Sequence, residues 1–423
     1  MSQEINKTEN QDLSLVVRAI GTDLEHTQVR MITSANADML FHYWKVGHFI
    51  LYLQKKEGWG SKVIDNLSKA IRSKYPDKKG YSRRNIFYMC QFASAYPLEV
   101  LKEMDRIDSL LTTPTVEKVL SLTNELNQIV QQPVALIQAT ENQSNTITQQ
   151  PVAQLEEVTE TLSAIYHCDI SQIEEIFKHS AIVRTNWASH VILLNSKLPL
   201  GECYWYITQA VANGWSRNVL QMQIESNLFA RQITTKKVSN FSARLPKPQS
   251  DLANYLMKDP YIFDMMGQTD KMAERDIERQ LVSHITKYLL EMGSGFAFVA
   301  QQKHFEVGDS DFYADLILYN IPLHAYVVVE LKATPFKPEY MGQLNFYINV
   351  VDDTLRGEHD NKTIGLLLCN GGDKVVAQYA LSGYDQPIGV SDYQLSKAIP
   401  DNLKSALPTV EEVEEELNRI MNI

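Results

Sequence analysis

Two charged side chains close an otherwise apolar run of sequence, VVVELK, at residues 327–332. Valine favours β-strands, and side chains two positions apart lie on the same face of a strand. Glu330 and Lys332 are therefore expected to project together. Such a pair most often belongs to a solvated surface. A strand this apolar, however, is expected to lie at the centre of a sheet, where little of either face meets solvent.

A second acid precedes this pair in the run FYADLILY. If residues 321–324 form a hairpin loop, Asn320 pairs with Ala325, and counting back places Asp315 opposite Glu330. Directly opposed side chains lie about 4.5–5.5 Å apart, so two ionised carboxylates would repel one another. A divalent cation between them removes that repulsion, and Mg²⁺ is commonly held by one or two carboxylates and phosphate oxygens. The spacing therefore indicates a metal site that handles a phosphate group.

The helix expected at residues 338–352 adds polar side chains beside this site. Pro338 suits the first helical position. Glu339, Gln343 and Tyr347 then follow at four-residue spacing, which places them on one helix face. That stripe would flank the scissile phosphate. The Lys332 ammonium, next to the metal, would orient the attacking water molecule or offset the negative charge of the phosphate.

The composition is that of a globular chain with more than one domain. Its 423 residues exceed a single ordinary core. The net charge of -11 does not favour nucleic acid, so any surface for such a partner must be local. The sequence has no apolar run long enough to span a membrane, its first residues are unlike a secretory signal, and its four cysteines are scattered. We therefore expect a cytoplasmic protein with no membrane partner.

The pattern along the chain predicts an α+β multidomain protein, with a mostly helical N-terminal half and a C-terminal α/β domain. A Gln- and Thr-rich segment interrupts the helical part, and a proline-containing segment precedes the α/β part. The expected order is a helical domain at 1–121, a polar linker or helical insertion at 122–158, a helical continuation at 159–242, an extended connector at 243–266 and the α/β domain at 267–423.

A basic segment lies where the N-terminal half is expected to form a helix-turn-helix-like element. One helix is expected at about 61–74, Pro76 and Gly80 break it, and Ser82 is a good cap for the next helix. The segment is either a solvated helical corner or a surface that contacts DNA phosphates. We expect DNA contacts from its basic residues, which are Lys69, Arg72, Lys74, Lys78, Lys79, Arg83 and Arg84.

The residues of the candidate metal site and of the helix that follows it resemble a known superfamily. Asp315, Glu330-Leu331-Lys332 and Gln343-x-x-x-Tyr347 look like the PD-(D/E)XK nuclease core, which has a restriction-endonuclease-like fold, together with the additional motif of its RecB-like members. Longer segments are similar to the bacterial YhcG family: FKPEYMGQLNFY, GWGSKVIDNLSKAIRSKYPDKKGYSRRNIFYM and NGWSRNVLQMQIES. The resemblance spans nearly the whole chain. It implies a DNA-binding N-terminal domain followed by a nuclease domain.

The resemblance also assigns roles to single residues. Ala314 stands where the motif often has proline, and residues around 125–158 depart from the family pattern. The residues implied to act in catalysis are Asp315, Glu330, Lys332, Gln343 and Tyr347. The implied ligands of Mg²⁺ or Mn²⁺ are Asp315, Glu330, the backbone carbonyl of Leu331 and Glu278, which lies on the helix expected before the sheet.

Two functions remain open from the sequence. The first is a metal-dependent nuclease, endonuclease or resolvase-like, that hydrolyses phosphodiester bonds in DNA during DNA processing or defence. The second is a DNA-binding or assembly module with a catalytically inactive nuclease fold. The complete set of motif residues favours the nuclease, because a degenerate site usually loses one of them. Enzymes of this class that cut both strands often dimerise, so a homodimer is one expected assembly.

Overall fold

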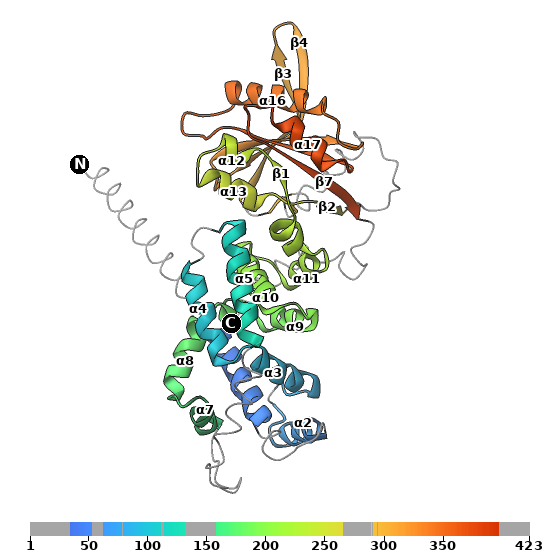
Figure 1. Cartoon of the computed structure of the whole chain (residues 1–423). Coiled ribbons are helices and arrows are strands. Elements are labelled where there is room, and N and C mark those ends of the chain that lie inside the picture. The colour runs from blue at the N-terminus through green and yellow to red at the C-terminus, as the bar shows by residue number, and fades with distance from the viewer. Residues whose placement is uncertain are drawn as a thin grey trace, which may run out of the picture. The chain divides into compact units, whose positions relative to one another are not determined.

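The computed structural model describes residues 34–52, 62–77, 79–110, 114–131, 158–264, 289, 291–293 and 295–396. The chain divides into two compact units. The first comprises Met1–Ser109 with Glu125–Ile207, and the second comprises Leu110–Asn124 with Thr208–Ile423. Figure 1 shows that the first unit is helical and that the second contains a sheet. The helical continuation expected at 159–242 is therefore shared between the two units.

Helices and their short connections make up the described chain as far as residue 235. The first helix covers residues 34–52. The others are α2 (Lys62–Lys74), α3 (Arg83–Ala95), α4 (Leu98–Leu110), α5 (Val116–Gln131), α7 (Val158–Tyr166), α8 (Ile170–His179), η2 (Ala181–Arg184), α9 (Trp187–Ser196), α10 (Leu200–Ala212), α11 (Arg217–Glu225) and η3 (Ala230–Thr234).

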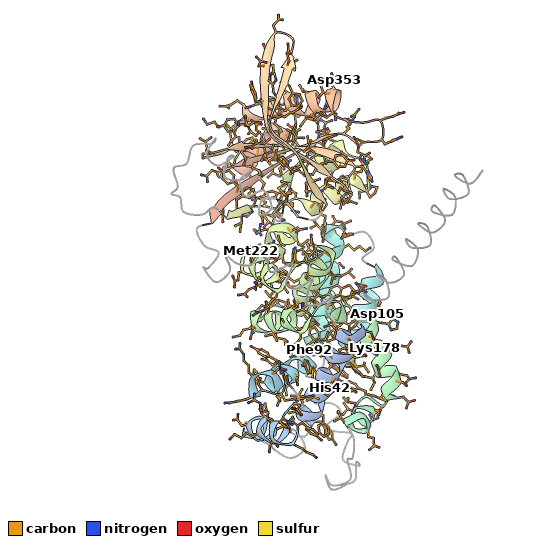
Figure 2. The ribbon with its side chains drawn as sticks, turned by 180° about the vertical axis from the view of Figure 1, so that it is seen from behind. His42, Phe92, Asp105, Lys178, Met222 and Asp353 are labelled. Atoms are coloured by element: carbon orange, nitrogen blue, oxygen red, sulfur yellow. The ribbon has the colours of Figure 1, made fainter. Side chains whose placement is uncertain are left out.

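Aromatic side chains form much of the core of the helical unit. Trp44 is fully buried, and its indole N–H donates to the carbonyl oxygen of Tyr96 at 2.7 Å. A buried indole needs such a partner, because an unpaired polar group in a core is costly. Phe92 of α3 is labelled among the side chains of the helical unit in Figure 2. Its ring centroid lies 5.4 Å from that of Trp187 and 4.9 Å from that of His190. These contacts hold α3 against the helices around it.

The helices predicted around the basic segment are present. Ser82 caps α3, and its side chain accepts a hydrogen bond from the Asn85 backbone N–H at 3.2 Å. Ile86 and Met89 of α3 pack with Leu67 of α2 in one apolar cluster. The connection between the helices covers residues 75–82, whereas a helix-turn-helix has a turn of about three to four residues. The pair therefore lacks the short turn of that motif.

The second unit is built on a mixed sheet with the strand order β1-β7-β6-β5-β4-β3. The strands are β1 (Val238–Ser239), β2 (Tyr261–Asp264), β3 (Phe296–Val307), β4 (Ser310–Asn320), β5 (Ala325–Lys332), β6 (Ile364–Cys369) and β7 (Ile388–Ser396). Neighbours among β3, β4 and β5 are antiparallel, whereas β5, β6 and β7 run parallel. Strand β2 pairs parallel with β7, and β1 pairs antiparallel with it.

Helices cover both faces of this sheet (Figure 1). The crossover helices α16 (Tyr340–Thr354) and α17 (Lys374–Leu381) pack on one face, where Leu344 and Leu381 share a core with Val328 of β5. Helices α12 (Phe241–Arg244) and α13 (Gln249–Leu256) cover the other face, where Phe241 shares a core with Val329. Strand β5 is therefore buried on both sides, which explains its unbroken apolar run.

Several predicted elements are confirmed. Strand β5 begins directly after the predicted hairpin loop and ends at Lys332, and Asn320 pairs with Ala325 across that loop. Ser216 caps α11, because its side chain accepts a hydrogen bond from the Val219 backbone N–H. The helix expected at 272–292 lies almost wholly outside the described residues. Within the described ranges, none of the helices is long and apolar enough to span a membrane.

One prediction about a connecting segment is wrong. The extended connector expected at 243–266 contains α13 and β2, and Met257 and Phe263 within it are buried. Its prolines suggested extended chain, yet Pro248 is the N-cap of α13, where the N–H that proline lacks has no partner within the helix. The segment expected at 122–158 as a polar linker or helical insertion begins within α5, which continues to Gln131, so residues 122–131 are helical. Residues 132–157 lie outside the described ranges.

Candidate active site

The two predicted acids lie on neighbouring strands at the point where their pairing ends. The last paired residues of β4 and β5 are Leu316 and Val329. Asp315 and Glu330 are the next residues on each strand, so they continue the predicted register. Asp315 is 6% exposed and Glu330 is fully buried. The hairpin therefore brings two carboxyl groups into the interior of the unit.

Both oxygens of the Asp315 carboxylate accept hydrogen bonds from adjacent strands. The Leu331 backbone N–H donates to Oδ2 at 3.0 Å. The Gln302 side-chain amide, on β3, donates to Oδ1 at 3.2 Å. Donors on both sides fix the plane of the carboxylate, because rotation about its last torsion would break both bonds.

Glu330 and Lys332 form a buried ion pair. The Lys332 ammonium donates to Glu330 Oε1 at 2.8 Å, and Lys332 is 8% exposed. The same ammonium lies 5.6 Å from the centre of the Tyr340 ring, and the Tyr340 hydroxyl is hydrogen-bonded to Thr334 at 2.6 Å. Burying two charges is costly, and their attraction offsets that cost only with good geometry. The lysine is thus held beside the acids by its partner and by an aromatic face.

Helix α16 brings Tyr347 against the same acids. Tyr347 is 5% exposed, whereas Gln343 is exposed. Burial raises the pKa of the Tyr347 phenol above its ordinary value. Hydrogen bonds from the Gln343 side chain and the Tyr313 backbone lower this pKa, and the charges of both acids raise it. The tyrosine hydroxyl is therefore a neutral group that links α16 to β4 two residues before Asp315.

Three further residues were predicted to belong to this site: Glu339, Leu331 and Glu278. Glu339 is the N-cap residue of α16 and is exposed, so the expected polar stripe runs from solvent into the core. Leu331 uses its backbone N–H to hold Asp315, and a role for its carbonyl in metal binding stays a prediction. Glu278 lies outside the described residues.

The donor set of this site suits a hard divalent cation. Carboxylate oxygens are the ligands that Mg²⁺ prefers, and it commonly takes only one or two of them and completes its shell with water and phosphate oxygens. Within the described ranges, no group of three or more His, Cys, Asp or Glu side chains is placed to hold a metal. The two acids therefore fit an ion whose other ligands are solvent or substrate, and do not fit a closed structural site.

Sequence reasoning missed Gln302 and Tyr340. The sequence pattern predicts a strand over residues 296–302 only, so it gives no partner for Gln302 on the next strand. Strand β3 instead extends to Val307, and its ladder with β4 would have placed Gln302 opposite Asp315. Tyr340 lies seven residues before Tyr347, which is about two helical turns. This spacing places both side chains on the same side of the helix and could have indicated that Tyr340 lies near the site.

The predicted DNA-binding residues lie in the other unit, on α2, on α3 and in the connection between them. Six of the seven are exposed, and Lys78 lies outside the described residues. The Arg83 guanidinium pairs with Asp65 at 3.0 Å, and that of Arg84 lies 5.6 Å from the Tyr88 ring centre. Exposed basic side chains at the start of a helix do not by themselves establish a nucleic-acid surface, so this assignment stays a prediction.

The fold and the site define a class of protein. A mixed sheet flanked by helices, with an aspartate on one strand and Glu-x-Lys on the next, is a PD-(D/E)XK nuclease fold. Residues 254–408 match the YhcG PDDEXK nuclease domain, and residues 19–122 match the DUF1016 N-terminal domain. The chain belongs to the YhcG family, as the sequence resemblance indicated.

A curated relative supports the same assignment. The Escherichia coli (strain K12) protein named "Putative nuclease YhcG" is 28% identical over 203 residues, which are 48% of this chain and 54% of that protein. The chain thus spans about half the length of the curated relative it matches. No solved structure matches the chain.

Proposed function

We propose that this chain is a metal-dependent nuclease that hydrolyses phosphodiester bonds in DNA. The observation that carries the proposal is the juxtaposition of Asp315, Glu330 and Lys332, buried at the end of one hairpin. A solvated surface would not need these charges in the interior. The alternative of an inactive nuclease fold is less favourable, because the ion pair and the fixed carboxylate keep the arrangement that catalysis requires.

In this proposal Asp315 and Glu330 hold Mg²⁺ or Mn²⁺, with the Leu331 carbonyl as a further ligand. A bound divalent cation lowers the pKa of water and stabilises negative charge on phosphate. Lys332 holds its ammonium at the acids, where it can donate hydrogen bonds to a phosphate oxygen or to the attacking water. Tyr347 holds β4, and therefore Asp315, in position through the Tyr313 backbone.

DNA is proposed as the substrate because of the exposed basic residues of α2 and α3. In a chain of net charge -11, they concentrate positive charge within a short segment. Such charges gain affinity by releasing counterions from the nucleic-acid backbone. Exposed Tyr75 lies beside Lys74, with the ammonium 5.5 Å from the ring centre, and adds a surface on which a base can stack.

The test is cleavage of linear, branched and single-stranded DNA, with RNA for comparison, in Mg²⁺, Mn²⁺ or EDTA. Glu330→Gln and Lys332→Met are expected to lower the rate at least about 100-fold, the scale for losing one transition-state contact. EDTA is expected to stop cleavage. Glu358→Gln and Lys362→Met make the same changes at exposed positions of the same unit and are expected to cleave like wild type.

Folding must be checked in the two site variants, because removing one member of a buried ion pair leaves the other unpaired. Circular dichroism and thermal melts of each variant serve this purpose. A folded Glu330→Gln protein that cleaves at the wild-type rate would contradict the assignment of the site. Wild-type protein that binds DNA but cleaves no substrate under any metal condition would favour the inactive-module alternative.

A further inference from the structure

Gln302 has an unusual backbone conformation beside the candidate site. Its φ is +44°. Non-glycine residues rarely adopt positive φ, because their Cβ crowds the backbone in that region. The other described non-glycine residues with positive φ are His167, Lys197 and Asn227, which follow helices, and His324, which lies in the hairpin loop. Among the described residues, Gln302 alone has this conformation within a strand.

The pairing of β3 with β4 defines the position of Gln302 in the sheet. The ladder between β3 and β4 pairs Gln301 with Leu316 and Lys303 with Ala314. Gln302 therefore lies opposite Asp315, shortly after the register shift of β3 between Phe298 and Ala300. Beyond this point β3 and β4 continue as a hairpin that projects from the rest of the sheet (Figure 1). The unusual backbone thus occurs at the base of the projection, beside the acid.

The Gln302 side chain uses this backbone to reach the carboxylate. Its amide donates to Asp315 Oδ1 at 3.2 Å, while the Leu331 N–H on the opposite side donates to Oδ2 at 3.0 Å. A ligand held in one orientation loses less entropy when a metal binds than one that rotates freely. Each carboxylate oxygen has two lone pairs, so accepting these bonds is compatible with metal ligation.

We propose that Gln302 is a positioning residue that presets the Asp315 carboxylate for a divalent cation. This inference rests on the proposed function, because it needs the two acids to bind the metal. Gln302 acts through Asp315 and is not itself a ligand. Partners that orient metal ligands in this way typically contribute about 10–100-fold to metal affinity. The backbone strain at Gln302 is consistent with a requirement for its side chain at this point.

The experiment is direct titration of the full chain with Mn²⁺ in the absence of nucleic acid, followed by electron paramagnetic resonance of the free ion. The variants are Gln302→Met, which keeps the length but removes the donor, and Gln302→Gly, which also relieves the backbone. Gln394→Met on β7 is the matched control, because Gln394 is likewise an exposed strand residue. Asp315→Asn identifies the site. Melting temperatures without metal report any structural damage.

We expect wild type and Gln394→Met to bind Mn²⁺ equally well and Asp315→Asn to lose the site. Both Gln302 variants should bind about 10-fold more weakly, with Gln302→Gly melting no lower than Gln302→Met. Wild-type affinity in both variants would overturn this inference and leave the proposed function standing. Weak binding in Gln302→Met that Gln302→Gly restores would assign the effect to backbone strain and would also overturn it. Failure of wild type to bind Mn²⁺ would overturn the proposed function together with this inference.

Discussion

At the scale of residues, the burial of the Glu330 carboxylate indicates that the site has a function beyond stability. A fully buried carboxylate is tolerated here because Lys332 donates to it at 2.8 Å within the same strand. Replacing such a pair by apolar residues is often neutral or stabilising, so stability alone does not explain its presence. The pair also lies beside a second buried acid, Asp315. A cation that engages both acids accounts for charges that packing does not require.

Tyr347→Phe tests the role of a hydroxyl at the same scale. The substitution removes the group that meets the Tyr313 backbone and the Gln343 side chain. We expect a loss of about 1 kcal/mol in the free energy of unfolding, measured by urea denaturation, because one buried partner is left unmatched. We also expect a cleavage rate about 10-fold lower, since this hydroxyl holds β4 near Asp315. The control is Tyr379→Phe, because Tyr379 is 77% exposed; equal losses in both variants would contradict the assigned role.

At the scale of elements, local signals predicted the hairpin and the places of the five residues proposed to act in catalysis. The register of β4 and β5 follows from the loop length, and spacing along α16 follows from helix geometry, so counting residues was enough. Gln302 was not predicted, because its contact depends on the extra length of β3 and on a backbone conformation that its residue type does not signal. Strand β7 was also missed. It depends on pairing with β6 across a crossover, and such pairing has no local signal.

The packing of α16 on β6 depends on Gly365, which has no side chain. A Cβ added at Gly365 would lie 2.5 Å from Ile348 Cδ1 and 3.1 Å from Leu344 Cδ2, both on α16. We expect Gly365→Ala to lower the free energy of unfolding by about 1–3 kcal/mol, the usual cost of overpacking. Cleavage should also slow, because α16 carries Tyr347. Thermal melts and rate measurements test this. Gly383→Ala is the control, since a Cβ there meets nothing within 4 Å; an unchanged melting temperature in Gly365→Ala would contradict the expectation.

At the scale of the whole molecule, the buried candidate catalytic residues and the exposed basic residues belong to different units of the chain. The acids and Lys332 lie in the second unit, whereas the basic residues of α2 and α3 lie in the first. The net charge of -11 opposes general attraction to nucleic acid. Affinity for DNA should therefore depend on the first unit and chemistry on the second. The two contributions should be separable by mutation.

The double substitution Arg72→Ala with Lys79→Ala tests this separation, because both side chains are exposed in the basic segment. If each contacts a phosphate, the slope of log affinity against log salt should flatten by about 2, since each contact contributes roughly 0.9 on duplex DNA. Fluorescence anisotropy from low to moderate salt measures the slope. Cleavage at saturating DNA should not change. Lys102→Ala with Lys118→Ala removes the same charge from α4 and α5 and should leave the slope nearly unchanged. Equal flattening in both pairs would show that net charge, rather than this segment, governs binding.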